Sequence, residues 1–229
     1  MAGPLKVLLI IPAYNEALNI ERVVDELRAG YPQYDYVVVN DGSQDDTAAI
    51  CRMRGYRFID LPINLGLAGA FQAGIKYAEL HDYDCAVQFD ADGQHRPEFI
   101  PRLIDGLSDS DIVIGSRFID ERKPFGLRMI GSSLLSAMIR LTTGVRLSDP
   151  TSGMRAYARS GISELASGPN LGPEPDTLAY LIRKKGLKVT EVKVRMAERV
   201  AGESYLNLKN SSAYMFRMVV SVMLIQLFR

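Results

Sequence analysis

Short runs of aliphatic residues alternate along the chain with segments whose apolar positions recur at helical spacing. Val7–Ile11 is the first such run and predicts a strand. Apolar residues then recur at i, i+3, i+4 and i+7 from Ile20 to Leu27, which predicts an amphipathic helix. This alternation is typical of an α/β fold with a mostly parallel central sheet flanked by helices. Further strands are expected at Tyr36–Val39, Tyr56–Leu61, Cys85–Phe89 and Asp111–Ile114, and further helices at Asp46–Met53, Asn64–Ala78, Glu98–Leu107 and Thr177–Lys185.

The C-terminal tail differs from the rest of the chain. Residues 1–202 continue the alternation without a linker, so we expect them to form one domain. Within residues 203–229, Met218–Leu227 is apolar except for Ser221 and Gln226. A membrane-spanning helix needs about 20 apolar residues, so we expect an amphipathic helix that binds a membrane surface or a partner. The alternative is a terminal helix that packs on the core.

The overall charge gives no reason to expect a nucleic-acid-binding protein. The chain has 27 lysines and arginines and 27 acidic residues, whereas nucleic-acid-binding proteins concentrate positive charge. The distribution is uneven, because Gly115–Ser160 holds eight basic residues against three acidic ones. Asp82–Asp111, in contrast, holds eight acids against two arginines. An acidic region therefore precedes a basic one.

The cysteines and the N-terminus bear on the cellular compartment. Cys51 and Cys85 have no spacing typical of a disulfide framework or a metal knuckle, which favours a reducing compartment. The apolar run near the N-terminus stops at Pro12 and is too short for the apolar core of a signal peptide. We therefore expect a cytoplasmic protein.

Two aspartates one residue apart, Asp90 and Asp92, follow the strand expected at Cys85–Phe89. Carboxylates this close repel each other unless a cation neutralises them, and hard divalent cations such as Mg²⁺ or Mn²⁺ prefer oxygen ligands. Ligands of open α/β sheets bind at the carboxyl ends of the strands, where this pair is expected. The pair therefore indicates a metal site, and the alternative is an aspartate pair that caps the turn before Pro97. His95 is a candidate ligand or a neighbour of the ligands.

Three other strand ends carry polar motifs. They are IPAYNE at Ile11–Glu16, NDGSQDDT at Asn40–Thr47 and NLGLAGA at Asn64–Ala70. Together with DADGQH at Asp90–His95, their order and spacing resemble a family 2 glycosyltransferase with the nucleotide-diphospho-sugar transferase fold called GT-A. The resemblance covers nearly the whole chain, and four motifs in order are more specific than any one of them. It implies a metal-dependent inverting glycosyltransferase that uses Mg²⁺ or Mn²⁺ and a UDP- or GDP-sugar.

The resemblance also implies roles for residues of the first half. Asp41 matches the acid that reads the base or ribose, and its alternative is a turn aspartate before Gly42. Asp90 and Asp92 match the family's DxD motif, with Asp92 the direct metal ligand and Gln94 a further ligand. The metal would bridge the donor's phosphates and neutralise the leaving diphosphate. The nucleotide-binding residues implied are Pro12, Ala13, Tyr14, Glu16, Asp41 and Asp90.

The second half resembles the branch that moves a sugar onto a polyprenyl phosphate, either dolichyl or undecaprenyl. The motifs are GSRF at Gly115–Phe118, DPTSGMRAY at Asp149–Tyr157 and AERVAGESY at Ala197–Tyr205. An anionic lipid phosphate needs cations, and guanidinium groups give it bidentate contacts. The acceptor-phosphate residues implied are Arg117, Arg128, Ser132 and Arg199, although Arg199 could instead close over the donor phosphates. The alternative for the three arginines is an ordinary surface charge. The residues implied in catalysis are Asp90, Asp92 and Arg117.

Two alternative functions stay open. A hydroxyl acceptor needs a general base, whereas a phosphate is already ionised. Glu174 and Asp176 are candidate bases for a glycosyltransferase that extends a glycan, although Asp176 is equally a candidate N-cap of the helix Thr177–Lys185. The second alternative is a non-catalytic scaffold that binds sugar nucleotides. In the preferred interpretation the protein is peripheral at the cytoplasmic face of the cell membrane. Its tail then binds the membrane surface, a small membrane protein or a second copy of the chain.

Overall fold

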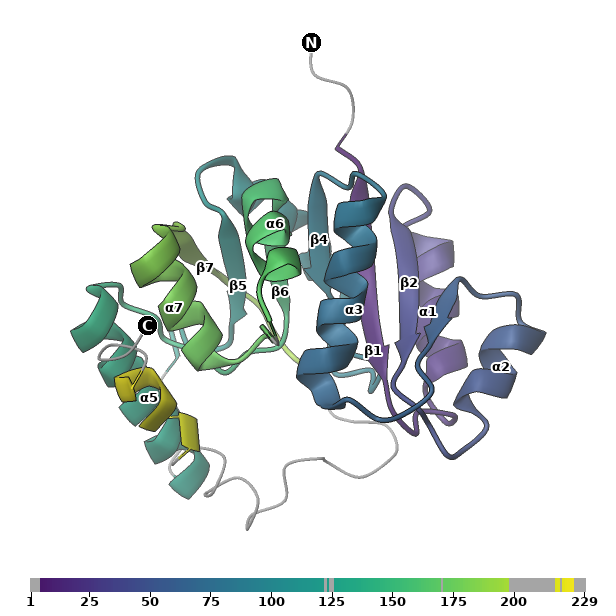
Figure 1. Ribbon diagram of the computed structural model, residues 1–229, viewed down its shortest axis with the longest axis horizontal. Helices are drawn as coiled ribbons and strands as arrows, with labels where there is room; N and C mark the ends of the chain where they lie inside the picture. The colour runs from purple at the N-terminus through teal and green to yellow at the C-terminus, as the bar shows by residue number, and fades with distance from the viewer. Residues whose placement is uncertain are drawn as a thin grey trace.

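A seven-stranded sheet in the order β3-β2-β1-β4-β6-β5-β7 forms the centre of the structure (Figure 1). The computed structural model describes residues 5–121, 123, 126–169, 171–197, 217–218 and 220–224, and only the backbone of Leu127 and Arg128. Strand β6 runs antiparallel to β4 and β5, and the other neighbouring pairs are parallel. The strands are β1 (Val7–Ala13), β2 (Asp35–Asn40), β3 (Phe58–Asp60), β4 (Cys85–Gln88), β5 (Ile112–Ser116), β6 (Arg155–Ala158) and β7 (Val189–Lys193).

Helices cover both faces of the sheet, and strand β1 shows why. Its side chains alternate, so that Leu9 and Ile11 join the core beneath one set of helices and Leu8 and Ile10 join the other. Figure 1 shows α3, α6 and α7 in front of the sheet. Helices α1 (Ile20–Gly30), α2 (Thr47–Met53) and α4 (Ile100–Asp105) pack on the first core, and α3 (Gly66–Leu80), α5 (Leu127–Thr143), α6 (Arg159–Ser167) and α7 (Pro175–Lys185) pack on the second. The structure therefore confirms the predicted α/β class.

One predicted helix is divided into three pieces. Instead of a helix over Glu98–Leu107, the chain forms a 3₁₀ turn at Pro97–Phe99, then α4, then a second 3₁₀ turn at Gly106–Ser108. Pro101 lies in the first turn of α4, where the missing N–H of proline is tolerated, but it cannot support a longer continuous helix. Strands β6 and β7 and helices α5 and α6 had no counterpart in the expected elements.

The described part of the tail packs on the core. Residues 217, 218 and 220–224 are helical, and Met218 and Val222 are buried. The Ser221 hydroxyl donates a hydrogen bond to Asp176 Oδ2 at 2.6 Å, which ties this helix to the start of α7. Met223 and Leu224 stay exposed. In the part of the chain that the structure describes, no helix is long and apolar enough to cross a membrane.

Candidate active site

The motifs of the first half meet at the carboxyl edge of the sheet. The parallel register places Ala13, the last residue of β1, beside Asn40, the last residue of β2. The Asp41 N–H donates to the Ala13 carbonyl at 2.8 Å. On the other side of β1, β4 runs parallel and delivers Asp90 and Asp92 to the same edge. The topology therefore brings together the nucleotide-binding and metal residues that the sequence implied.

A hydrogen-bond network joins the loops after β1 and β2. The Asn15 N–H donates to Ser43 Oγ at 2.9 Å, and the Glu16 N–H donates to Thr47 Oγ1 at 2.9 Å. Asn15 has a φ of 56°, in the left-handed region that asparagine tolerates. Tyr14, between these anchored loops, is exposed and available to a ligand. The two loops thus form one unit at the edge of the sheet.

Asp41 is buried and connects β2 to the start of α3. Its Oδ1 accepts the Leu65 N–H at 2.7 Å. Burial raises the pKa of the Asp41 carboxyl, and the N–H groups of Leu65 and Gly66 oppose that rise. The next residue, Gly42, has a φ of +64°, and a Cβ there would lie 2.6 Å from the backbone carbon of Ile63. Asp41 therefore helps to hold the start of α3 in place. That it binds the base or ribose of a nucleotide stays a prediction.

Asp90 is held by the side chains of Gln88 and His95. Gln88 Nε2 donates to Asp90 Oδ1 at 3.1 Å, and His95 Nε2 lies 3.3 Å from Oδ2. The Asp90 N–H donates to His95 Nδ1 at 2.9 Å. Because Nδ1 accepts a hydrogen bond, a neutral His95 carries its proton on Nε2 and can donate it to the carboxylate. Both ring nitrogens of this buried histidine are thus engaged with Asp90, so we interpret His95 as a residue that orients it.

Asp92 lies in a tight turn and is almost fully buried. Its Oδ1 accepts the Gln94 N–H at 2.9 Å, and Gly93 between them has a φ of +76°. An added Cβ at Gly93 would collide with the guanidinium of Arg22. The Gln94 carbonyl accepts the Ala197 N–H at 2.8 Å. The start of the AERVAGESY segment therefore lies against the aspartate motif, while Arg199 is outside the described residues.

The donor atoms of this turn fit a hard divalent cation. Two carboxylates at a strand end are ligands that Mg²⁺ and Mn²⁺ accept, and Mg²⁺ commonly takes its other ligands from water and substrate phosphates. Within the described ranges, no group of three or more histidine, cysteine or acidic side chains could hold a metal by itself. Asp90 and Asp92 therefore fit a metal that a diphosphate helps to bind. Gln94 as a further ligand stays a prediction.

Arg117 follows β5 at the same edge and is fixed by a buried aspartate. Its Nε and Nη2 donate to the two carboxylate oxygens of Asp149 at 2.6 and 2.8 Å. The Asp149 N–H in turn donates to Glu191 Oε1, on β7, at 2.7 Å. Asp149 opens the DPTSGMRAY motif, from which no role for it was expected, and no sequence signal pointed to Glu191. The Arg117 side chain remains 29% exposed beside the buried aspartate, so a ligand can reach it.

Ser132 lies on the inner face of α5 and contacts Lys123, a lysine that no sequence motif singled out. Lys123 Nζ donates to Ser132 Oγ at 2.9 Å and to Ser136 Oγ at 3.3 Å. The Phe118 ring has Arg117 Cζ at 5.1 Å and Lys123 Nζ at 5.7 Å from its centroid. The structure thus brings Arg117 and Ser132 into one region, with Lys123 between them. The Arg128 side chain is outside the described residues.

The two candidate bases differ in their surroundings. Burial raises the pKa of the Glu174 carboxyl, Asp176 raises it further, and Arg155 and Arg217 oppose the rise. Asp176 accepts the Thr177 N–H at 2.8 Å and the Ser221 hydroxyl. The prediction of Asp176 as N-cap is wrong, because the helix opens at Pro175 and Glu174 occupies the cap position. Glu174 is therefore the stronger of the two candidates.

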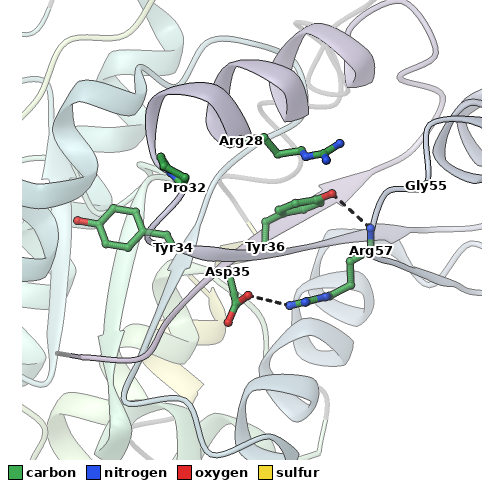
Figure 2. A pocket seen from close by; sticks show the side chains of 7 residues that line it. All are labelled: Arg28, Pro32, Tyr34, Asp35, Tyr36, Gly55 and Arg57. Carbon is green, nitrogen blue, oxygen red and sulfur yellow. Dashed lines mark hydrogen bonds and ion pairs between the residues drawn. The ribbon is translucent and has the colours of Figure 1, made fainter. Parts of the chain in front are cut away.

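A surface hollow of about 370 Å³ lies away from this site, at the amino ends of β2 and β3 (Figure 2). Arg57 closes one side, with an ion pair to Asp35 at 3.0 Å and an N–H bonded to the Tyr36 hydroxyl at 3.4 Å. Ligands of open α/β sheets bind at the opposite, carboxyl edge. The hollow is lined by Arg28, Pro32, Tyr34, Asp35, Tyr36, Gly55 and Arg57.

Comparisons with known proteins match the chain to a family model and to curated relatives. The family model described as glycosyl transferase family 2 matches residues 8–166. An undecaprenyl-phosphate mannosyltransferase of Micrococcus luteus is 32% identical over 216 residues, covering 89% of this chain and 88% of the relative. A polyprenol monophosphomannose synthase of Mycolicibacterium smegmatis is 30% identical over 234 residues, covering 93% of this chain and 85% of the relative.

Solved structures show the same architecture. Glucosyl-3-phosphoglycerate synthase from Mycobacterium tuberculosis, crystallised with Mn²⁺, uridine diphosphate and phosphoglyceric acid, superposes with a TM-score of 0.74. The two chains are 21% identical, and the match covers 98% of this chain and 80% of the synthase. This likeness confirms the predicted GT-A fold.

Proposed function

Because the chain belongs to glycosyl transferase family 2 and is a glycosyltransferase, we propose that it moves a sugar from a nucleotide-diphospho-sugar to a polyprenyl phosphate. The observation that carries this proposal is that an acidic site and a basic site lie along the same edge of the sheet. The carboxylates Asp90 and Asp92 follow β4, and the cation Arg117 follows β5, which runs in the same direction. The names of the two relatives above, which specify undecaprenyl phosphate and polyprenol, support this acceptor.

The donor side is proposed to bind the diphosphate through Asp90 and Asp92. Mg²⁺ or Mn²⁺ held there would neutralise the charge that develops on the leaving diphosphate. His95 and Gln88 keep the Asp90 carboxylate in place, and the turn at Gly93 presents Asp92. The nucleoside, from a UDP- or GDP-sugar, would lie along Pro12–Glu16 and Asp41. Neither the nucleotide nor the sugar is specified further by these contacts.

The acceptor side is proposed to bind an anion that is itself the nucleophile. A phosphate oxygen of the lipid forms a bond to the anomeric carbon as the bond from that carbon to the diphosphate oxygen breaks. The nucleoside diphosphate leaves, the configuration inverts, and no proton has to be removed. Arg117 and Ser132 would orient the phosphate, and the predicted contributions of Arg128 and Arg199 complete this assignment.

An apolar stripe on α5 supports contact with a membrane. Ile130, Leu134 and Leu141 are exposed on the helix face opposite buried Leu135 and Ile139. The sequence from 122 to 148 contains basic residues and no acidic one. A cationic amphipathic helix suits the surface of a bilayer with anionic lipids. We therefore propose a peripheral protein at the cytoplasmic membrane face.

The two-part organisation follows from the same proposal. Residues 1–202 would be the catalytic part, and residues 203–229 would bind the membrane surface, a small membrane protein or a second copy of the chain. The exposed Met223 and Leu224 offer apolar surface for such contacts.

The testing experiment measures transfer from radiolabelled UDP-glucose, UDP-N-acetylglucosamine and GDP-mannose to a short-chain polyprenyl phosphate, with Mn²⁺ and with chelator. Asp92→Asn is compared with Asp105→Asn, an exposed aspartate of α4. The expected result is metal-dependent lipid label from one donor, lost in Asp92→Asn and kept in the control. Binding of a sugar nucleotide without lipid label from any donor would contradict the proposal. It would favour the scaffold, or a hydroxyl acceptor with Glu174 or Asp176 as base.

A further inference from the structure

Lys123 differs from Arg117 in its partners. Arg117 is paired with Asp149 through two short hydrogen bonds. Lys123 Nζ instead contacts two neutral hydroxyls, those of Ser132 and Ser136. The described residues place no carboxylate within ion-pair distance of this ammonium. A lysine ammonium has three donors and no acceptor, so two serines leave capacity for an anion.

The surroundings of Lys123 increase the attraction of an anion. Burial lowers the pKa of the Lys123 ammonium, Arg117 lowers it further, and Asp149 and Glu191 oppose the effect. A partly buried charge interacts more strongly with a counter-ion than a surface charge does, because the surroundings screen it less. The Ser136 hydroxyl donates to the Ser132 carbonyl at 3.0 Å, so its oxygen can accept from the lysine. The lysine is thus fixed against α5 in a position that favours an anion.

We propose that Lys123 binds the phosphate of the acceptor, together with Ser132 and the exposed part of Arg117. This inference rests on the proposed function, because it takes the anion to be the lipid phosphate. Both cations lie near the Phe118 ring, with Arg117 Cζ at 5.1 Å and Lys123 Nζ at 5.7 Å from its centroid, so the two positive charges share one region. Ser132, buried on the inner face of α5, adds a neutral hydroxyl. The site therefore recognises a phosphate monoester by two cations of different kinds.

The position of α5 connects this phosphate site to a lipid surface. Ser132 and Ser136 face inward, while Leu134 and Leu141 on the same helix face outward. One helix would thus contact lipid on one side and the lipid's phosphate, through Lys123, on the other.

The test measures steady-state kinetics of Lys123→Gln and Lys123→Arg with a short-chain polyprenyl phosphate and the donor found for the wild type. Lys184→Gln, an exposed lysine of α7, is the matched control. Loss of one hydrogen bond to a charged group predicts a fall of about 10- to 100-fold in kcat/KM for the acceptor. The KM for the donor should stay within about 2-fold, and Lys123→Arg should recover most of the acceptor effect.

A pH profile separates phosphate binding from a purely structural contact. The charged groups that face the ammonium are Arg117, Asp149 and Glu191, and α5 contributes hydroxyls. In the wild type, kcat/KM for the acceptor should fall on the alkaline side, starting at a lower pH than for an ordinary lysine. This fall should be absent in Lys123→Arg, since arginine stays charged.

The outcomes distinguish the two proposals. If the wild type labels no polyprenyl phosphate, the proposed function fails. If it labels the lipid but Lys123→Gln leaves the acceptor KM and kcat unchanged, or raises the donor KM instead, the inference about Lys123 is wrong. If Lys123→Gln does not fold, the pH profile of Lys123→Arg is the deciding measurement. An unchanged alkaline limb in Lys123→Arg would overturn the inference.

Discussion

Asp149 is fully buried and holds the guanidinium of Arg117 through two hydrogen bonds, at 2.6 and 2.8 Å. This pair decides how Arg117 can meet a ligand. The Ser148 N–H and hydroxyl also donate to Glu191 Oε2, each at 2.7 Å, so β7 fixes the loop that carries Asp149. The proposed phosphate contact of Arg117 therefore depends on residues that never touch the acceptor.

Asp149→Asn should weaken both the fold and the acceptor site. Weakening hydrogen bonds between charged groups costs about 1.5–3 kcal/mol, which urea denaturation can measure. Acceptor KM should rise by about 10-fold or more, because the guanidinium loses its orientation. Arg159→Gln removes partly exposed contacts with Asp82, Glu79 and the Tyr83 carbonyl, so it should cost about 1 kcal/mol and leave acceptor KM unchanged. Equal effects of the two variants would refute a role for Asp149 in positioning Arg117.

His95→Gln should weaken use of the metal. The variant loses the ring that contacts Asp90 with both nitrogens, and loss of such a supporting contact typically costs about 10- to 100-fold in metal affinity. The measurement is the Mn²⁺ concentration that gives half-maximal transfer. His81→Gln, at the end of α3, is the control and should match the wild type. An unchanged Mn²⁺ requirement in His95→Gln would show that Asp90 does not need this support.

Glu174→Gln separates a phosphate acceptor from a hydroxyl acceptor. With polyprenyl phosphate, turnover should stay within a few-fold of the wild type, because no base is needed. Loss of about 100-fold or more would instead favour Glu174 as a base.

The same variant tests the raised pKa of Glu174. Folding raises the pKa of this carboxyl, so the free energy of unfolding of the protein falls as the pH rises from the ordinary pKa through the raised one. Glu174→Gln should therefore be more stable than the wild type above that window, and the difference should shrink at acid pH below it. Urea denaturation at a series of pH values measures this, and a difference that does not vary with pH would contradict the burial argument.

Gly42→Ala should destabilise the protein more than Gly55→Ala. Both glycines have a positive φ, +64° and +63°, which costs other residues about 1–2 kcal/mol. The added Cβ at Gly42 also meets the backbone of Ile63, and overpacking typically adds about 1–3 kcal/mol. At Gly55 it meets no described atom within 4 Å. If urea denaturation gives the same loss of unfolding free energy for both variants, the loop at Gly42 shifts to accommodate the added Cβ.

Leu141→Glu should reduce binding to vesicles that contain anionic lipid. Leu141 is 80% exposed on the α5 stripe, so a charge there opposes insertion without disturbing the core. Leu80→Glu is the control, because Leu80 is 77% exposed but lies at the end of α3. Sedimentation with vesicles should show a loss of about 10-fold for Leu141→Glu alone. Equal loss in both variants would mean that α5 is not the contact surface.

The sequence alone determined the fold class and the donor motifs. Continuous apolar runs mark β1, β2 and β4 because both faces of these strands are buried, and a helical apolar repeat marks α1 because only one of its faces is buried. Parallel strands place their carboxyl ends on one edge, so Asp41, Asp90 and Asp92 could be expected together before any coordinates. These features depend on local spacing and on one rule of topology.

Only the tertiary structure decided which side chains pair across the chain. Asp149 lies 32 positions from Arg117 and Glu191 lies 42 from Asp149, and no local repeat encodes such contacts. The selection of Lys123 from a run of basic residues likewise depends on α5, which supplies its two serines. Buried charges take their roles from their neighbours in space, and long-range packing, not the local pattern, determines those neighbours.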